Sequence, residues 1–184
     1  IFYINIYIYF FYFFIFRLIS CLMHKIKNSI NISLNNIKKF FINLGLEEMV
    51  NQSVSRDLNV NEMKVDNPYK PDLKDLYRLY FFILNNKRTT VMEFGSGWSS
   101  LVMALALTEL KKKYSSTISK LRRNNPFELF IIENEKKYFS ISKKRLKRFS
   151  KKINIKINYL STDVIMTTYK GIISTEYKKL PLCN

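Results

Sequence analysis

The chain has 184 residues, of which 47% are hydrophobic, and its formal net charge at pH 7 is +17. This length suits one domain with an appendage, and this hydrophobic content is enough for a buried core. Cys21, Cys183 and the sole histidine, His24, lack the spacing of a metal site, which excludes a Cys/His zinc site and a disulfide scaffold. Two such thiols indicate a reducing compartment.

The positive charge allows two interpretations. It could mark a surface that binds nucleic acid or an anionic membrane. It could also reflect solvated faces in a chain that is rich in Lys, Ile, Asn, Phe and Tyr throughout. The lysines are spread along the chain and lack the regular aromatic interleaving of a base-stacking surface. The pattern therefore favours solvated faces over a nucleic-acid site.

Residues 1–22 form a hydrophobic segment in which sixteen residues precede the first charge, Arg17. The run is shorter than the ~20 apolar residues of a spanning helix, and no basic residues precede it as in a signal peptide. Three interpretations stay open: a membrane anchor, upstream sequence translated ahead of Met23, or a buried segment. An anchor followed by Lys25 and Lys27 would keep the next domain in the cytoplasm. We expect a cytoplasmic protein, attached to the inner face of the membrane if the segment is an anchor.

Residues 23–71 are predicted to be an N-terminal helical segment and a linker. Apolar residues at helical spacing, between an N-cap serine and a glycine, predict a short helix over residues 33–44. The mixed, polar stretch at residues 46–71 predicts the linker. A second helix, over residues 72–86, begins directly after a proline.

From residue 89 onward, strand and helix patterns alternate. Short apolar or alternating runs predict strands at residues 89–94, 127–133 and 153–160, with helices between them at residues 98–114 and 134–150. This alternation is typical of parallel βαβ units with right-handed crossovers. Residues 72–184 are therefore predicted to form an α/β domain with a Rossmann-like parallel sheet, in which only three strands are present. No helix or strand is predicted beyond the third strand.

Two of the four glycines lie in the turn between the first strand and its helix, at Gly95 and Gly97. Because glycine has no side chain, such a turn leaves backbone N–H groups accessible. It also places a helix N-terminus at the carboxyl edge of a parallel sheet, where nucleotides bind. The dinucleotide fingerprint G-x-G-x-x-G is incomplete, because Ser100 replaces its third glycine. Glu93 precedes the turn, and its carboxylate would repel a pyrophosphate. It suits a ligand that carries an ammonium and a sulfonium group.

With Glu93 ahead of Gly95 and Gly97, the stretch resembles the first motif of class I S-adenosylmethionine-dependent methyltransferases, in particular an uncharacterised bacterial subgroup. The resemblance implies that Glu133, at the end of the second strand, accepts both ribose hydroxyls. It implies that Asp163, just after the third strand, contacts adenine. These five residues would bind S-adenosyl-L-methionine, without a metal, for SN2 methyl transfer to an unknown acceptor.

Each position also has a structural alternative. Gly95 and Gly97 could serve only to shape the turn. Glu93 could cap the helix that follows it, and Glu133 could cap the next one, because negative charge is stabilised at a helix N-terminus. Trp98 could lean over the ligand or pack under the first helix.

The family's sheet has seven strands, and its catalytic base and acceptor pocket usually come from the fourth strand onward. We therefore expect a gene product truncated at its C-terminus, which carries the cofactor half and is inactive alone. The first strand would keep one open edge. Two other classes stay open. One is a non-catalytic basic binding or partner module, which completes itself through another chain or binds anionic lipid or RNA. The other is an NAD(P)-type nucleotide-binding domain.

Overall fold

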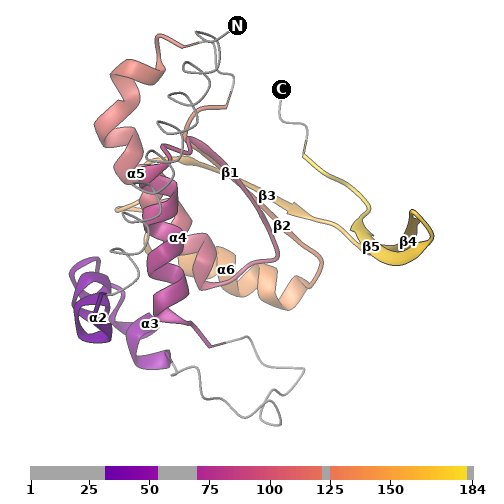
Figure 1. The fold of residues 1–184 in the computed structure, drawn as a ribbon, viewed down its shortest axis with the longest axis horizontal. Helices are drawn as coiled ribbons and strands as arrows, with labels where there is room; N and C mark the ends of the chain where they lie inside the picture. Colours follow the sequence, from indigo (N-terminus) through magenta and orange to yellow (C-terminus); the bar gives the residue numbers. More distant parts are fainter. Residues whose placement is uncertain (1–31, 54–69, 122–124, 182–184) are drawn as a thin grey trace, which may run out of the picture.

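The computed structural model describes residues 32–53, 70–121 and 125–181, and Figure 1 draws the rest of the chain in grey. The hydrophobic segment at residues 1–22 and the greater part of the predicted linker lie outside the described residues. Among the helices that the structure describes, none is long and apolar enough to span a membrane.

The described elements alternate between helix and strand as predicted from residue 72 to residue 161. In chain order they are α2 (Leu34–Asn43), α3 (Glu47–Gln52), α4 (Leu73–Asn85), β1 (Thr90–Phe94), α5 (Trp98–Ile118), β2 (Glu128–Glu133), α6 (Lys136–Arg148), β3 (Lys156–Ser161), β4 (Val164–Tyr169) and β5 (Ile172–Tyr177). The chain is thus an α/β protein, consistent with a Rossmann-like fold. Three elements differ from the prediction: helix α3 and the two strands β4 and β5.

Helix α3 lies at the start of the predicted linker and corrects that prediction. Its six residues are too few to show a periodic apolar pattern. Tertiary contact stabilises it instead, because Met49 is fully buried in the main core. Glu47 and Glu48 in its first turn also favour a helix start there.

The hairpin β4–β5 follows the last predicted strand, so the prediction of three strands holds for the parallel sheet but not for the chain. The two strands pair antiparallel across Lys170 and Gly171, whose φ angles are 50° and 80°. Two consecutive positive φ angles are what a tight type I′ turn requires. Lys-Gly is a weaker signal for this turn than Asn-Gly, so the sequence pattern did not predict it.

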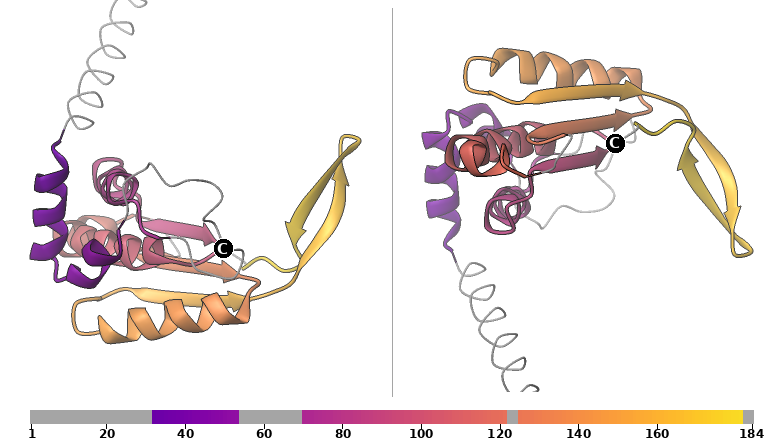
Figure 2. Two further views of the ribbon diagram at one scale, coloured as in Figure 1. Left: turned by 90° about the horizontal axis from the view of Figure 1, so that it is seen from below. Right: turned by 90° about the horizontal axis from the view of Figure 1, so that it is seen from above.

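The main sheet is parallel, in the order β1-β2-β3, and Val91, Leu129 and Ile157 lie side by side across it. Because strand order follows chain order, right-handed crossovers place α5 and α6 on the same face, as Figure 2 shows for α6 along β3. The main core joins this face of the sheet to α2, α4, α5 and α6. Among the described strands, β1 pairs only with β2, so its other edge is open as predicted.

Helix α5 is the centre of the core. Every residue from Leu101 to Thr108 is buried, because α4, α6 and the sheet surround this stretch. A helix that is enclosed on all sides has no polar face, which explains the uninterrupted apolar run in the sequence. The N-terminus of this central helix is thereby fixed at the carboxyl end of β1.

Asp72 defines the start of α4, because its carboxylate accepts hydrogen bonds from the N–H groups of Lys74, at 2.8 Å, and Asp75, at 3.1 Å. These N–H groups have no acceptor within the helix, so Asp72→Ala is expected to lower the free energy of unfolding by about 1 kcal/mol. Urea denaturation would measure the change. Glu176→Ala, at an exposed position of β5, is the control and should stay within about 0.5 kcal/mol of the unaltered chain. Equal midpoints for both variants would contradict the capping role.

Candidate functional site

The turn between β1 and α5 contains both predicted glycines. The structural reason for glycine differs between the two positions. Gly95 has φ +90°, which favours glycine, and its N–H donates to the Ile132 carbonyl oxygen at 2.8 Å. Gly97 is extended, with φ −171°, and a Cβ placed on it would meet nothing closer than Ser99 Oγ, at 3.6 Å. The turn geometry thus accounts for Gly95. The chain itself does not require glycine at position 97, whereas close approach of a ligand to the backbone would.

The Glu93 carboxylate lies against the first turn of α5. It accepts hydrogen bonds from the hydroxyl of Ser99 and, at 2.5 Å, from the hydroxyl of Ser100. Ser100 Oγ in turn accepts the N–H of Gly97 at 3.1 Å. Glu93 thus contacts the helix start through serine hydroxyls, rather than through the backbone N–H groups that a capping side chain accepts. A ligand contact for Glu93 stays a prediction.

The pKa of Glu93 is raised from 4.5 to about 7. Burial is the largest cause, because removing the carboxylate from water disfavours its charged form. The hydrogen bonds from Ser100 and Ser99 lower the pKa in part, and the negative charge of Glu133 raises it. A carboxyl group with this pKa is about half ionised near neutral pH, so a nearby cation would strongly favour its charged form.

Glu133 ends β2 at the same edge, beside the glycine turn, and its side chain is buried. Ser96, between the two glycines, donates its hydroxyl to Glu133 Oε2 at 2.6 Å, and the N–H of Glu135 donates to Oε1 at 3.0 Å. Since Glu135 is the N-cap of α6, Glu133 does contact a helix start, as its structural alternative supposes. Its second oxygen, however, already receives a hydroxyl donor, which is the same kind of group as a ribose hydroxyl.

Asp163 lies between β3 and β4, and its side chain is exposed. Its neighbour Thr162 donates its N–H to the Glu133 carbonyl oxygen at 3.1 Å, and the Asp163 carbonyl oxygen accepts the N–H of Lys178 at 2.9 Å. Asp163 is therefore at the same edge of the sheet as Glu133. The predicted contact of the Asp163 carboxylate with adenine stays a prediction.

Trp98 is buried under the start of α5, which is the packing alternative of the sequence analysis. Its indole N–H donates to Gln52 Oε1 at 3.3 Å, and the guanidinium carbon of Arg145 lies 3.8 Å from the centre of its ring. Burial lowers the pKa of Arg145, and the negative charge of Glu48 partly restores it. Helices α3 and α6 thus hold the residue that follows the glycine turn.

Sequence reasoning missed two kinds of site residue. Ser96 and Ser100 form hydrogen bonds to the predicted carboxylates, although their side chains gave no pattern of their own. Tyr177, at the end of β5, stacks on Phe94 at the end of β1, with ring centres 5.4 Å apart. A tyrosine more than 80 positions from its partner gives no local signal. Its role depends on the hairpin, which was not predicted either.

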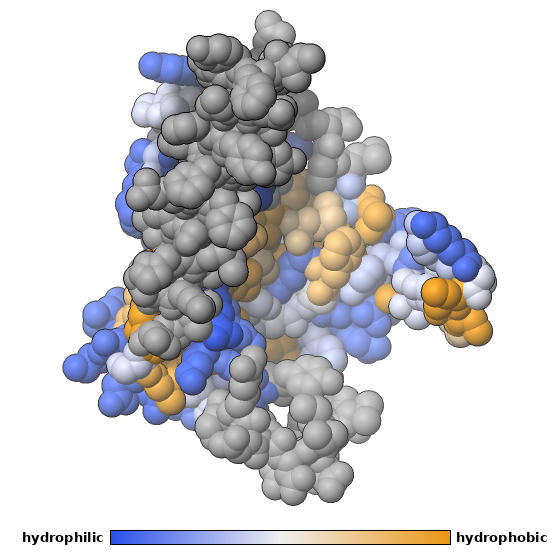
Figure 3. Space-filling view, in the orientation of Figure 1, coloured by the Kyte–Doolittle hydropathy of each residue, from blue (hydrophilic) through white to orange (hydrophobic). Residues whose placement is uncertain are grey.

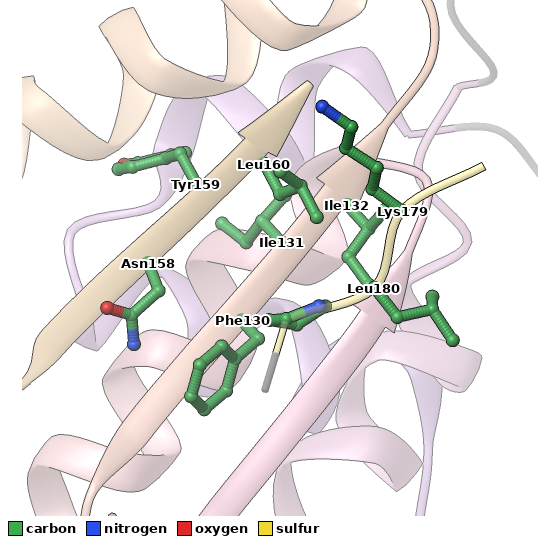
Figure 4. A pocket seen from close by; sticks show the side chains of 9 residues that line it. Phe130, Ile131, Ile132, Asn158, Tyr159, Leu160, Lys179 and Leu180 are labelled. Atoms are coloured by element: carbon green, nitrogen blue, oxygen red, sulfur yellow. The ribbon is translucent and has the colours of Figure 1, made fainter. Parts of the chain in front are cut away.

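A separate pocket of about 240 Å³ lies on the sheet face opposite the helices (Figure 4). Phe130, Asn158 and Leu160 line it from the strands, and Leu180 lies across it. None of the five predicted ligand residues lines this pocket. Within the described residues, no group of His, Cys, Asp and Glu side chains could hold a metal ion.

In comparisons with known proteins, no family model, no curated protein and no solved structure matches this chain. The fold and the local chemistry are therefore the basis for any assignment. The fold establishes an α/β protein with a parallel three-stranded sheet.

Proposed function

We propose that the chain binds S-adenosyl-L-methionine at the carboxyl edge of its parallel sheet and is the cofactor half of a class I methyltransferase. The observation that carries the proposal is that two carboxylates, those of Glu93 and Glu133, lie beside the same glycine turn. Ser100 links Glu93 to the Gly97 amide, and Ser96 links the turn to Glu133. The carboxyl edge of a parallel sheet, with a helix N-terminus beside it, is where such folds bind nucleotides.

Each residue has a distinct chemical role in this proposal. Gly97 lets the ligand approach the backbone, and the α5 N-terminus faces the carboxylate of the amino-acid tail. Glu93 is near the ammonium or sulfonium charge, which favours its ionised form. Glu133 accepts the two ribose hydroxyls, the first of them in the place of the Ser96 hydroxyl. Asp163 contacts the adenine.

The reaction would be an SN2 displacement, in which a nucleophilic O, N or C attacks the methyl carbon and the thioether leaves with the electron pair. The sulfonium donor is already activated, so the protein mainly aligns the two reactants. A base is needed only where the acceptor must lose a proton. We assign neither the acceptor nor a base to the described residues, and the chain alone is expected to bind the donor without turnover.

Titration calorimetry of the 184-residue chain tests the proposal. We expect saturable heat with S-adenosylmethionine and none with NADH, because a carboxylate at position 93 repels a pyrophosphate and attracts a cation. Uptake of NADH without uptake of S-adenosylmethionine would contradict the proposal and favour the NAD(P)-type alternative. Affinity for RNA or anionic vesicles that falls steeply with salt, without uptake of either cofactor, would favour the basic binding module.

A further inference from the structure

The hairpin β4–β5 extends from the body of the protein, and among the described strands β4 and β5 pair only with each other (Figures 1 and 2). Apolar side chains are exposed on it, and Figure 3 shows hydrophobic colour on this part of the surface. An isolated two-stranded hairpin is only marginally stable in water. The contacts at its base therefore determine where it lies.

Those contacts lead back to the candidate site. Tyr177 is paired with Val164 in the hairpin register, and the Lys178 N–H donates to the Asp163 carbonyl oxygen at 2.9 Å, which closes the base. The Tyr177 ring lies 5.4 Å from the Phe94 ring with an interplanar angle of 29°. Phe94 itself is the residue that precedes the glycine turn. Tyr177 is thus held between the ends of β1 and β3.

Glu133 lies at this same edge. Phe94 is level with Ile132 in the sheet, and Glu133 is the next residue of β2. The negative charge of Glu133 raises the pKa of the Tyr177 phenol, after burial as the larger cause, and the backbone of Gly95 lowers it in part. The electrostatic coupling agrees with the contacts: the phenol, the glycine turn and the carboxylate are neighbours.

We propose that Tyr177 is a ligand-contacting residue, whose ring stacks on the planar base of the bound cofactor. The proposal rests on the function proposed above and extends it. If Glu133 holds the ribose hydroxyls, the base bonded to that sugar must lie within a few ångströms of the carboxylate. Tyr177 is the aromatic side chain that the hairpin brings to this point, with Phe94 supporting its other face. The hairpin then serves to complete the cofactor site rather than to extend the sheet.

Calorimetry with S-adenosylhomocysteine as the probe tests this assignment in four forms of the chain. Tyr177→Ala is expected to weaken binding about tenfold, the typical loss of one base–aromatic stack. Tyr177→Phe keeps the ring and should bind within about twofold of the unaltered chain. Tyr169→Ala is the matched control, because Tyr169 lies on the same hairpin and is 65% exposed; its affinity should not change.

The outcomes separate the two proposals. If the unaltered chain binds the probe and Tyr177→Ala binds it equally well, the stacking role is overturned and the proposed function stands. If the unaltered chain gives no heat, both are overturned. A second measurement does not depend on how the alanine variant folds. With 3-fluorotyrosine at position 177, the ¹⁹F resonance should shift when the probe is added. The same label at position 169 should not respond, and an unshifted resonance at position 177 would overturn the assignment.

Discussion

Replacing Glu133 with alanine is expected to reduce the affinity for S-adenosylmethionine by at least about 100-fold, because two hydrogen bonds from ribose hydroxyls to a charged acceptor are lost together. Residue Glu133 is only 4% exposed, so little water is available to replace its carboxylate as a partner for those hydroxyls. Titration calorimetry at pH 7.5 would measure the loss. The variant also leaves the Ser96 hydroxyl and the Glu135 N–H without their acceptor, so a modest loss of stability is expected as well.

Glu128 provides the matched control for this experiment. It is the first residue of β2, whereas Glu133 is the last, and it is also buried. Its carboxylate binds Lys156 at 3.1 Å and Asn158 at 2.7 Å, at the opposite end of the strand from the glycine turn. Glu128→Ala should therefore cost stability without changing cofactor affinity. Equal loss of binding in both variants would mean that the effect comes from a weakened sheet, and unchanged binding in Glu133→Ala would contradict the ribose role.

The parallel part of the fold could be predicted from the sequence because each element has a clear apolar period. Helix α4 carries buried residues at helical spacing after an N-cap, and β2 is a nearly continuous apolar run because both of its faces are buried. Helix α3 could not be predicted, since its stability depends on the burial of Met49 among residues from distant elements. The hairpin was missed because its strands carry apolar residues that are exposed, such as Met166 and Ile173.

The site could be predicted only as far as topology determines it. Parallel strands end at one edge, so Glu93, Glu133 and Asp163 had to lie near each other once the strands were known. Which partner each carboxylate selects depends on side-chain geometry: the sequence does not reveal that Glu93 turns toward Ser99 and Ser100 while Glu133 turns toward Ser96. The contact of Tyr177 with Phe94, more than 80 residues away along the chain, depends on the hairpin, which the sequence pattern did not predict.

Replacing Glu93 with glutamine is expected to stabilise the folded chain at high pH and to weaken its cofactor binding. In the folded chain the pKa of Glu93 is raised from 4.5 to about 7. A raised pKa means that folding favours the protonated acid. The associated stability is fully present below pH 4.5 and is lost as the pH rises through about 7, a total of about 3 kcal/mol. Glutamine has nearly the same shape and does not ionise, so the variant should not lose this stability.

Thermal unfolding between pH 5 and pH 8 would measure this effect as a gap between variant and unaltered chain that widens with pH. Ser99→Ala is the comparison: it keeps the acid but removes one of the hydrogen bonds that lower its pKa, so its stability should still fall with rising pH, with the fall shifted to higher pH. A gap of the same size at pH 5 and pH 8 would contradict the raised pKa.

Cofactor binding should respond to pH in the opposite direction. A cationic ligand favours the charged form of Glu93, so the affinity of the unaltered chain for S-adenosylmethionine should increase as the pH rises through about 7. The same titration in Glu93→Gln should show weaker binding that does not gain from this ionisation. A gain in affinity with rising pH that Glu93→Gln lacks would distinguish a ligand contact from a helix-start role. If affinity were equal in both chains at every pH, Glu93 would be a helix-start residue alone.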